Sequence, residues 1–177
     1  MEKEVLWTEL GRATLLDAYM RKVDEVHYQM PTGERATFNI AVEGPVVGVL
    51  ALTPDNQVIL TKQFRPGPAE TLWELPGGFI DKGENPAQTA SRELLEETGY
   101  QGELRAVGKT FADAYSTKVR HYFVATNCRR VGEQQLDGRE FIEVTLVPLE
   151  KFREILRSGQ MSDVAGGYMA LDALGLL

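Results

Sequence analysis

The sequence has little cysteine, little histidine and no excess of positive charge, and each shortage excludes a class of protein. Its one cysteine, Cys128, cannot form an intrachain disulfide, so a disulfide framework is excluded. The two histidines, His27 and His121, lie far in sequence from the acidic residues discussed below, which disfavours a zinc centre. The net charge of −7 argues against nonspecific nucleic-acid binding, because such binding uses a basic surface.

Long apolar runs are also lacking. No stretch approaches the length needed to cross a bilayer, and the first four residues, MEKE, do not have the basic-then-apolar pattern of a secretory signal. We therefore expect a cytoplasmic protein with neither a membrane nor a nucleic acid as partner. An apolar content of 43% over 177 residues fits one globular domain, with or without a small appendage.

Turn residues and apolar patterning predict an α+β chain. The turn sequences Pro-Thr-Gly-Glu at 31–34 and Pro-Asp-Asn-Gln at 54–57 each separate two expected strands of a hairpin. The expected strands are 18–29, 35–42, 46–52, 58–64, 72–75, 106–110, 120–125 and 141–147. Helices are expected at 86–98, 148–157 and 162–174. The order of strands, helix, strands and helices favours α+β over regular βαβ alternation.

The helix expected at 86–98 has clear end signals. Asn85 is a good N-cap, Pro86 suits the first helical position and Gly99 suits the C-terminal cap. At about 100° per residue, Ala87, Ala90 and Leu94 share one stripe, which we expect to contact the core.

Three glutamates, Glu93, Glu96 and Glu97, fall on the stripe beside this apolar one. Like charges three and four residues apart cost a few tenths of a kcal/mol per pair, and anions near a helix C-terminus cost roughly 0.3–1 kcal/mol. These penalties would be offset by a cation among the carboxylates, for which Mg²⁺ or Mn²⁺ is better suited than zinc. The alternative is a solvated acidic face.

The run from Gly77 to Tyr100, GGFIDKGENPAQTASRELLEETGY, resembles the Nudix box, G-x5-E-x7-R-E-U-x-E-E-x-G-U, in which U is a bulky apolar residue. The residues at the fixed positions are Gly78, Glu84, Arg92, Glu93, Leu94, Glu96, Glu97, Gly99 and Tyr100. Tyr100 is the one departure, since an aliphatic residue is usual there. The resemblance implies an α/β/α sandwich with a mixed sheet, here preceded by an N-terminal antiparallel β hairpin.

The same resemblance implies a reaction, in which water attacks a phosphorus of a nucleoside diphosphate linked to another group. Glu93 and Glu97 would be metal ligands with Glu96 beside them, and the Gly77 carbonyl would be a further ligand. Mg²⁺ is the expected cofactor, with Mn²⁺ as a possible substitute. Arg92 would hold Glu93 or Glu84 through a charge-assisted contact, and so belongs with the catalytic group.

Outside the box, residues 63–67 (QFRPG), 73–78 (WELPGG) and 159–177 resemble the ADP-ribose and nucleotide-sugar pyrophosphatases. This likeness implies that residues 1–44 form a β segment for dimerisation or strand exchange, and that residues 45–177 form the hydrolase domain of a homodimer. It also implies that Arg65 and Glu74 bind substrate. A surface salt bridge for Arg65 and structural support for Glu74 are the alternatives.

A catalytic base is expected from the polar loop at 134–140, where Glu140 is the first candidate and Glu143 the second. Tyr115 stands where ADP-ribose enzymes commonly have proline, and a tyrosine near this position is associated with diadenosine polyphosphate hydrolases. The N-terminal extension and the sequence around Arg65 fit those hydrolases poorly, so ADP-ribose or a nucleotide sugar is the first expected substrate. A dinucleoside polyphosphate or another nucleotide-linked compound is the alternative. A non-catalytic nucleotide-sensing module is a third interpretation.

Overall fold

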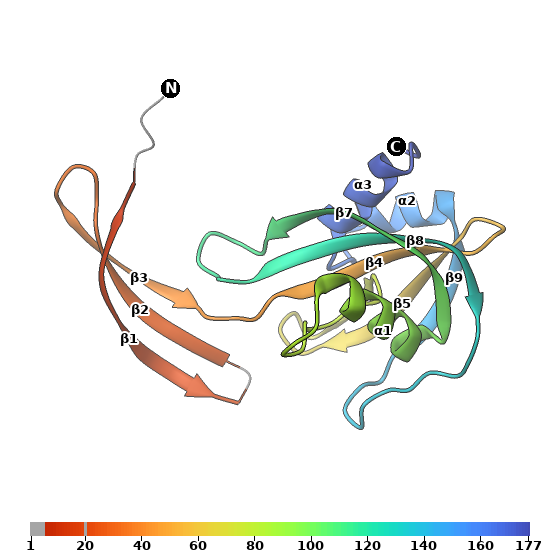
Figure 1. Cartoon of the computed structure of the whole chain (residues 1–177), viewed down its shortest axis with the longest axis horizontal. Coiled ribbons are helices and arrows are strands. Elements are labelled where there is room, and N and C mark those ends of the chain that lie inside the picture. Colours follow the sequence, from red (N-terminus) through yellow and green to blue (C-terminus); the bar gives the residue numbers. More distant parts are fainter. Residues whose placement is uncertain (1–5, 20) are drawn as a thin grey trace. The chain divides into compact units, whose positions relative to one another are not determined.

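The computed structural model describes residues 6–19 and 21–177, which divide into two compact units (Figure 1). One unit comprises Met1–Pro45 with Phe111–Val119, and the other comprises Val46–Thr110 with Arg120–Leu177. Residues 1–5, at the start of the predicted N-terminal segment, and residue 20, inside the strand predicted at 18–29, lie outside the described residues.

The N-terminal unit contains a three-stranded antiparallel sheet in the order β1-β2-β3. Its strands are β1 (Thr8–Ala18), β2 (Arg21–Gln29) and β3 (Arg35–Ala41). The predicted hairpin is present as β2 and β3, and Gly33 turns the chain between them with φ 88°. The strand predicted to begin at Ala18 was wrong at its start, because Ala18 ends β1 and pairs with Arg21 of β2.

Aromatic rings pack together on this small unit. Trp7, Tyr28, Phe38 and Tyr115 form a chain of ring contacts with centroids 5.8 to 6.2 Å apart. The Ala41 amide donates to the Tyr115 carbonyl at 2.8 Å, which ties the segment Phe111–Val119 to β3. The side chains of β1 are exposed along its whole length.

The second unit is built on a six-stranded mixed sheet in the order β6-β5-β4-β8-β7, with β9 on the other edge of β5. The parallel pair is β4 with β8, whereas β5 pairs antiparallel with β4, β6 and β9. The strands are β4 (Val46–Leu52), β5 (Gln57–Arg65), β6 (Glu70–Glu74), β7 (Tyr100–Phe111), β8 (Val119–Arg130) and β9 (Glu143–Pro148).

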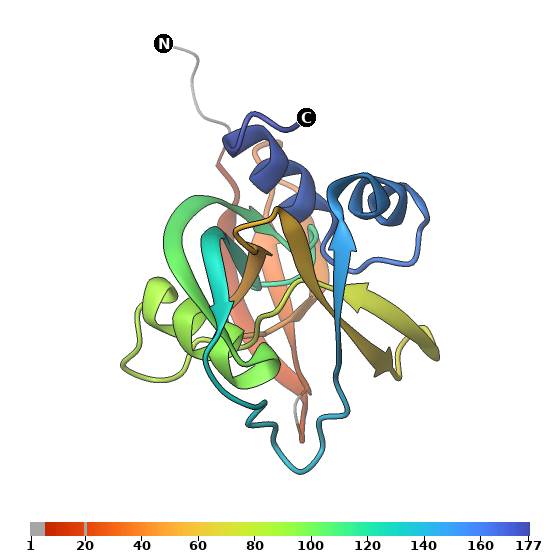
Figure 2. The same ribbon diagram turned by 90° about the vertical axis from the view of Figure 1, so that its right-hand side faces the viewer.

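Helices cover both faces of this sheet (Figure 2). Because successive side chains of a strand point to opposite faces, Val47 and Val49 of β4 pack with α1 (Pro86–Thr98), and Leu50 packs with α2 (Leu149–Arg157) and α3 (Val164–Ala173). This is the α/β/α sandwich that the sequence predicted. Over residues 6–19 and 21–177, no helix combines the length and apolar character of a membrane span.

Candidate active site

Helix α1 begins and ends where the sequence predicted. The Asn85 side chain accepts hydrogen bonds from the amides of Ala87 and Gln88, and the Gln88 side chain accepts one from the Asn85 amide, so the capping box is complete. Gly99 closes the other end in the left-handed region with φ 76°. These caps fix where the helix begins and ends.

The buried face of α1 includes an acid. Ala90 and Leu94 are buried against the sheet, as predicted, and Glu97 continues the same stripe with only 7% of its surface exposed. Ala87, which was predicted to join this stripe, is exposed at the first turn. The Glu97 carboxylate accepts a hydrogen bond from the Gly77 amide at 2.9 Å, so the helix is tied to the loop before it.

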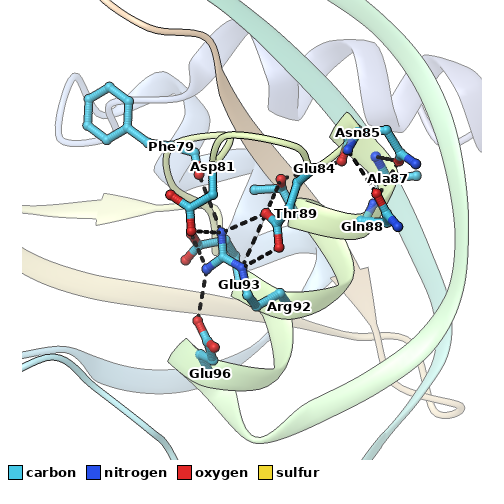
Figure 3. A network of polar contacts seen from close by, with 10 residues as sticks. All are labelled: Phe79, Asp81, Glu84, Asn85, Ala87, Gln88, Thr89, Arg92, Glu93 and Glu96. Carbon is cyan, nitrogen blue, oxygen red and sulfur yellow. Dashed lines mark hydrogen bonds and ion pairs between the residues drawn. The ribbon is translucent and has the colours of Figure 1, made fainter.

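Arg92 is the centre of the polar network on the adjacent face of α1 (Figure 3). Its guanidinium donates to Glu84 at 3.0 Å, to Glu93 at 2.9 Å and to Glu96 at 2.9 Å. It also donates to the Phe79 carbonyl at 3.4 Å. The sequence predicted a contact with Glu93 or Glu84, and one guanidinium contacts both. Arg92 also lowers the pKa of Glu84.

Two glycines allow the loop to lie against its neighbours. A Cβ at Gly77 would stand 2.1 Å from the Val47 carbonyl oxygen of β4, and a Cβ at Gly78 would stand 2.4 Å from the Glu93 carboxylate. Each glycine therefore occupies a position where a side chain would overlap existing atoms. Gly78 leaves room for the Glu93 carboxylate beside the backbone.

Burial and mutual repulsion disfavour the ionised forms of two of these glutamates. Burial raises the pKa of Glu97 to about 8; the Gly77 amide opposes this, and the charges of Glu93 and Glu140 add to it. Burial is also the main cause of the raised pKa of Glu93, which Arg92 opposes. Without a bound cation, the surroundings of these two carboxyl groups therefore favour the uncharged form more than water does.

The loop between β8 and β9 brings Glu140 to this face of the helix. A polar cavity of about 150 Å³ is lined by Arg92, Glu93, Glu96, Glu97, Gln135, Asp137 and Glu140. Glu143, the second candidate base, points elsewhere: its side chain is 68% exposed and lies 3.9 Å from Lys62 of β5. Of the two candidates, the geometry therefore favours Glu140.

The two predicted substrate-binding residues form a pair with each other. The Arg65 Nε donates to Glu74 at 2.7 Å, and a second guanidinium nitrogen contacts the other carboxylate oxygen. Glu74 is buried, whereas 44% of the Arg65 side chain is exposed. Glu74 thus orients a guanidinium that remains open on one side. The hydrogen bond with Glu74 is the main cause of the raised pKa of Arg65, and the charge of Glu97 adds to it.

The donors around the cavity fit a hard divalent cation in their chemistry. Five carboxylates and a glutamine amide supply oxygen atoms, which Mg²⁺ and Mn²⁺ prefer. In the part of the chain that the structure describes, no three acidic, histidine or cysteine side chains already converge as a metal-binding cluster. Arg92 holds Glu93 and Glu96, and the Gly77 amide holds Glu97. A cation would have to compete with these contacts.

Comparison with known proteins gives the family to which this fold and this acidic helix belong. Residues 42–164 match the family model of the NUDIX domain, which is more than half of the chain. The chain therefore belongs to the Nudix family and is a Nudix hydrolase acting on nucleoside diphosphate-linked compounds. The family prediction made from residues 77–100 is confirmed.

Several relatives extend over nearly the whole chain. The ADP-ribose pyrophosphatase of Bacillus subtilis is 31% identical over 170 residues, covering 94% of this chain and 89% of the relative. The CMP-5'-(N-acetyl-N-hydroxy-3-aminopropyl)phosphonate hydrolase of Streptomyces rubellomurinus is 30% identical over 175 residues, covering 96% and 84%. The crystal structure of an ADP compounds hydrolase has a TM-score of 0.84 at 21% identity, covering 99% of this chain and 100% of that chain, which shows the shared fold.

Proposed function

We propose that this enzyme hydrolyses the diphosphate bond of ADP-ribose or a related nucleoside diphosphate sugar, giving a nucleoside monophosphate and a sugar phosphate. The observation that carries the proposal is the carboxylate-lined cavity over α1, where Glu140 from the loop lies opposite the glutamates of the Nudix box. The similarity to an ADP-ribose pyrophosphatase over 94% of the chain supports this substrate class.

Glu93, Glu97 and the Gly77 carbonyl would hold Mg²⁺, with Glu96 beside them. Gly77 suits this role because of the directions of the hydrogen bonds around it. The carbonyls of Pro76 and Gly78 each accept a hydrogen bond from an amide of β4 at 2.9 Å, whereas the Gly77 amide donates in another direction, to the Glu97 carboxylate. In extended backbone the carbonyl of a residue lies on the same side as its own amide, so that oxygen would face the carboxylates. When bound, Mg²⁺ would neutralise the diphosphate and lower the pKa of the attacking water.

The remaining roles fall to side chains of this chain. Glu140 would accept a proton from the attacking water, because its carboxylate lines the cavity and its charge acts on both Glu93 and Glu97. Arg92 would keep Glu93 and Glu96 oriented when the substrate is absent. Arg65, oriented by Glu74, would contact the substrate's phosphates or ribose through its exposed side.

Tyr115 does not require a dinucleoside polyphosphate substrate. Its ring stacks on Phe38 with centroids 5.9 Å apart, so packing within the N-terminal unit gives it a role of its own. ADP-ribose or a nucleotide sugar is therefore proposed first, although Tyr115 stands where ADP-ribose enzymes commonly have proline.

A substrate panel tests the proposal. ADP-ribose, UDP- and GDP-sugars, diadenosine polyphosphates and NADH would each be incubated with enzyme and Mg²⁺ or Mn²⁺, and both products identified. We expect the highest kcat/KM for ADP-ribose or a nucleotide sugar, with AMP and ribose 5-phosphate released from ADP-ribose. A highest value for a diadenosine polyphosphate, with ATP among the products, would overturn the proposed substrate class.

We also propose that the enzyme is a homodimer associated through the N-terminal unit. Strand β1 exposes Leu10, Leu15 and Leu16 to 46%, 54% and 46%, and exposed apolar side chains grouped on one strand favour association. Light scattering after size exclusion should give twice the chain mass of 19.7 kDa. A mass of one chain at working concentrations would contradict this proposal.

A further inference from the structure

The twelve residues between β8 and β9 carry Glu140, yet contain no helix or strand. The first residues of this loop, directly after β8, are hydrogen-bonded to the C-terminal end of α1. The amides of Val131 and Gly132 donate to the Gly99 carbonyl at 2.9 and 3.3 Å, and the Gln135 amide donates to the Glu96 carbonyl at 2.8 Å. A helix leaves its last carbonyls without intrahelical partners, and these amides supply donors to them.

Gln134 adds a contact that these backbone bonds do not make. Its side-chain nitrogen donates to the Glu97 carbonyl at 2.7 Å and to the Ile142 carbonyl at 3.1 Å. Both partners are acceptors that carry no proton, so the NH₂ group is the part of the amide that faces them. One side chain therefore joins the end of α1 to the residue immediately before β9.

The contact between Gln134 and Ile142 joins the two ends of the segment that carries Glu140. Gln134 precedes residues 135–141 and Ile142 follows them, so the glutamine closes the base of the segment that carries Glu140. Inside this segment, Glu140 and Asp137 bond each other: the Glu140 amide donates to the Asp137 carbonyl at 2.9 Å, and the Asp137 amide donates to the Glu140 carboxylate at 3.0 Å. This pair stiffens the tip but does not attach it to the helix.

Glu97 is hydrogen-bonded to two different loops. Its carboxylate accepts from the Gly77 amide and its carbonyl accepts from Gln134, so a single helical residue connects the loop before α1 with the loop that carries Glu140. The distance between the Glu140 carboxylate and the other acids therefore depends on where Gln134 holds the loop base.

We propose that Gln134 is a positioning residue for hydrolysis, which holds the loop base against α1 and so keeps Glu140 over the cavity. This inference rests on the proposed role of Glu140. Gln134 acts through Glu140 and does not line the cavity itself. Its loss should reduce turnover only while Glu140 is there to be positioned.

The test uses Gln134→Met, which keeps the length of the side chain and removes both donors. We expect kcat for ADP-ribose to fall about tenfold with KM changed less than about twofold, as two hydrogen bonds of modest net strength are lost. Amide hydrogen exchange at 136–141 should accelerate by a similar factor. Glu133→Gln is the matched control. Glu133 is next to Gln134 in the sequence, its side chain is 88% exposed, and among the ion pairs described it pairs only with Arg130.

A double-mutant cycle separates positioning from general stability. In a Glu140→Gln background, adding Gln134→Met should lower kcat less than about twofold, because the group that it positions is already lost. An equal fold-loss in both backgrounds, or wild-type exchange at 136–141 in Gln134→Met, would overturn the inference. Wild-type turnover in Glu140→Gln would instead overturn the proposed function of Glu140, while hydrogen exchange still tests whether Gln134 anchors the loop.

Discussion

Replacing Glu97 with glutamine should stabilise the metal-free protein while strongly reducing its turnover. Glu97 is 7% exposed, and its charge is opposed by burial and by the charges of Glu93, Glu140 and Glu74. The Gly77 amide donates a hydrogen bond to its carboxylate and partly offsets this. Glutamine has nearly the same shape and can accept the same hydrogen bond. The change therefore removes the repelled charge and leaves the packing of α1 in place.

The size of the effect follows from the pKa. The carboxyl ionises near 4.5 when exposed and near pH 8 in the folded protein, so holding its charge above pH 8 costs on the order of 5 kcal/mol. Between these two pH values the folded state binds a proton that the unfolded state has released. Stability of the metal-free wild type therefore falls as the pH rises through this window, and it levels off above pH 8.

Urea unfolding in EDTA at pH 6 and pH 9 measures this difference. We expect the advantage of Glu97→Gln in unfolding free energy to grow by about 3 kcal/mol between the two pH values. Turnover of ADP-ribose in saturating Mg²⁺ should fall by about 10²–10⁴-fold, as a metal ligand is lost. Glu96→Gln is the control, because the Glu96 side chain is 37% exposed and paired with Arg92. Its unfolding free energy relative to wild type should not rise comparably between pH 6 and pH 9.

Two results would refute the reasoning. An unfolding free energy with the same pH dependence in wild type and Glu97→Gln would mean that the buried carboxyl is not repelled as described. Wild-type turnover in Glu97→Gln at saturating Mg²⁺ would remove this residue from the proposed metal site.

Three further variants test other parts of the site. Glu140→Gln should lower kcat about 10²–10⁴-fold, the usual contribution of a general base, with metal affinity measured by calorimetry little changed. Arg92→Ala should lower the unfolding free energy by about 1–3 kcal/mol in urea titrations without metal, since partly buried carboxylates lose their cation. Gly77→Ala should lower it by about 2 kcal/mol or more and reduce turnover, because the new methyl group would overlap the backbone of β4.

Each of these variants has a matched control in the chain. Glu143→Gln alters an exposed acid of β9 and should keep turnover; if it is the damaging change and Glu140→Gln is not, the base has been assigned to the wrong glutamate. Arg130→Ala breaks an exposed ion pair worth about 0–1 kcal/mol. If Arg92→Ala lowered the unfolding free energy no more than Arg130→Ala does, the central role of Arg92 would be contradicted. Gly67→Ala has open space around the new atom, and an equal loss there would contradict the overlap argument.

The parts of the fold that the sequence predicted well are those with strong local signals. Helix α1 has its N-cap, its proline and its C-terminal glycine at the expected positions, and the turn residues at 31–34 and 54–57 separate observed strands. Strand β1 was missed because it has register shifts between Glu9 and Gly11 and between Thr14 and Leu16. Bulges there interrupt the alternation of apolar and polar residues by which a strand is recognised.

The same reasoning applies to the site. The acidic stripe of α1 could be predicted because helical geometry fixes the relation of Glu93, Glu96 and Glu97. The extent of β7, which begins at Tyr100 and not at residue 106, could not be predicted from its mostly exposed residues. Gln134 was also missed as an individual residue, because its two partners are carbonyls 37 and 8 residues away in sequence, and no local pattern marks such a contact.

The most direct test of the account is a crystal structure of the enzyme with Mg²⁺ and a non-hydrolysable ADP-ribose analogue. We predict Mg²⁺ between the carboxylates of Glu93 and Glu97 and the Gly77 carbonyl, with the diphosphate beside it and the Glu140 carboxylate facing the phosphorus that is attacked. A bound analogue whose diphosphate lies away from α1, with no cation among these carboxylates, would contradict the account.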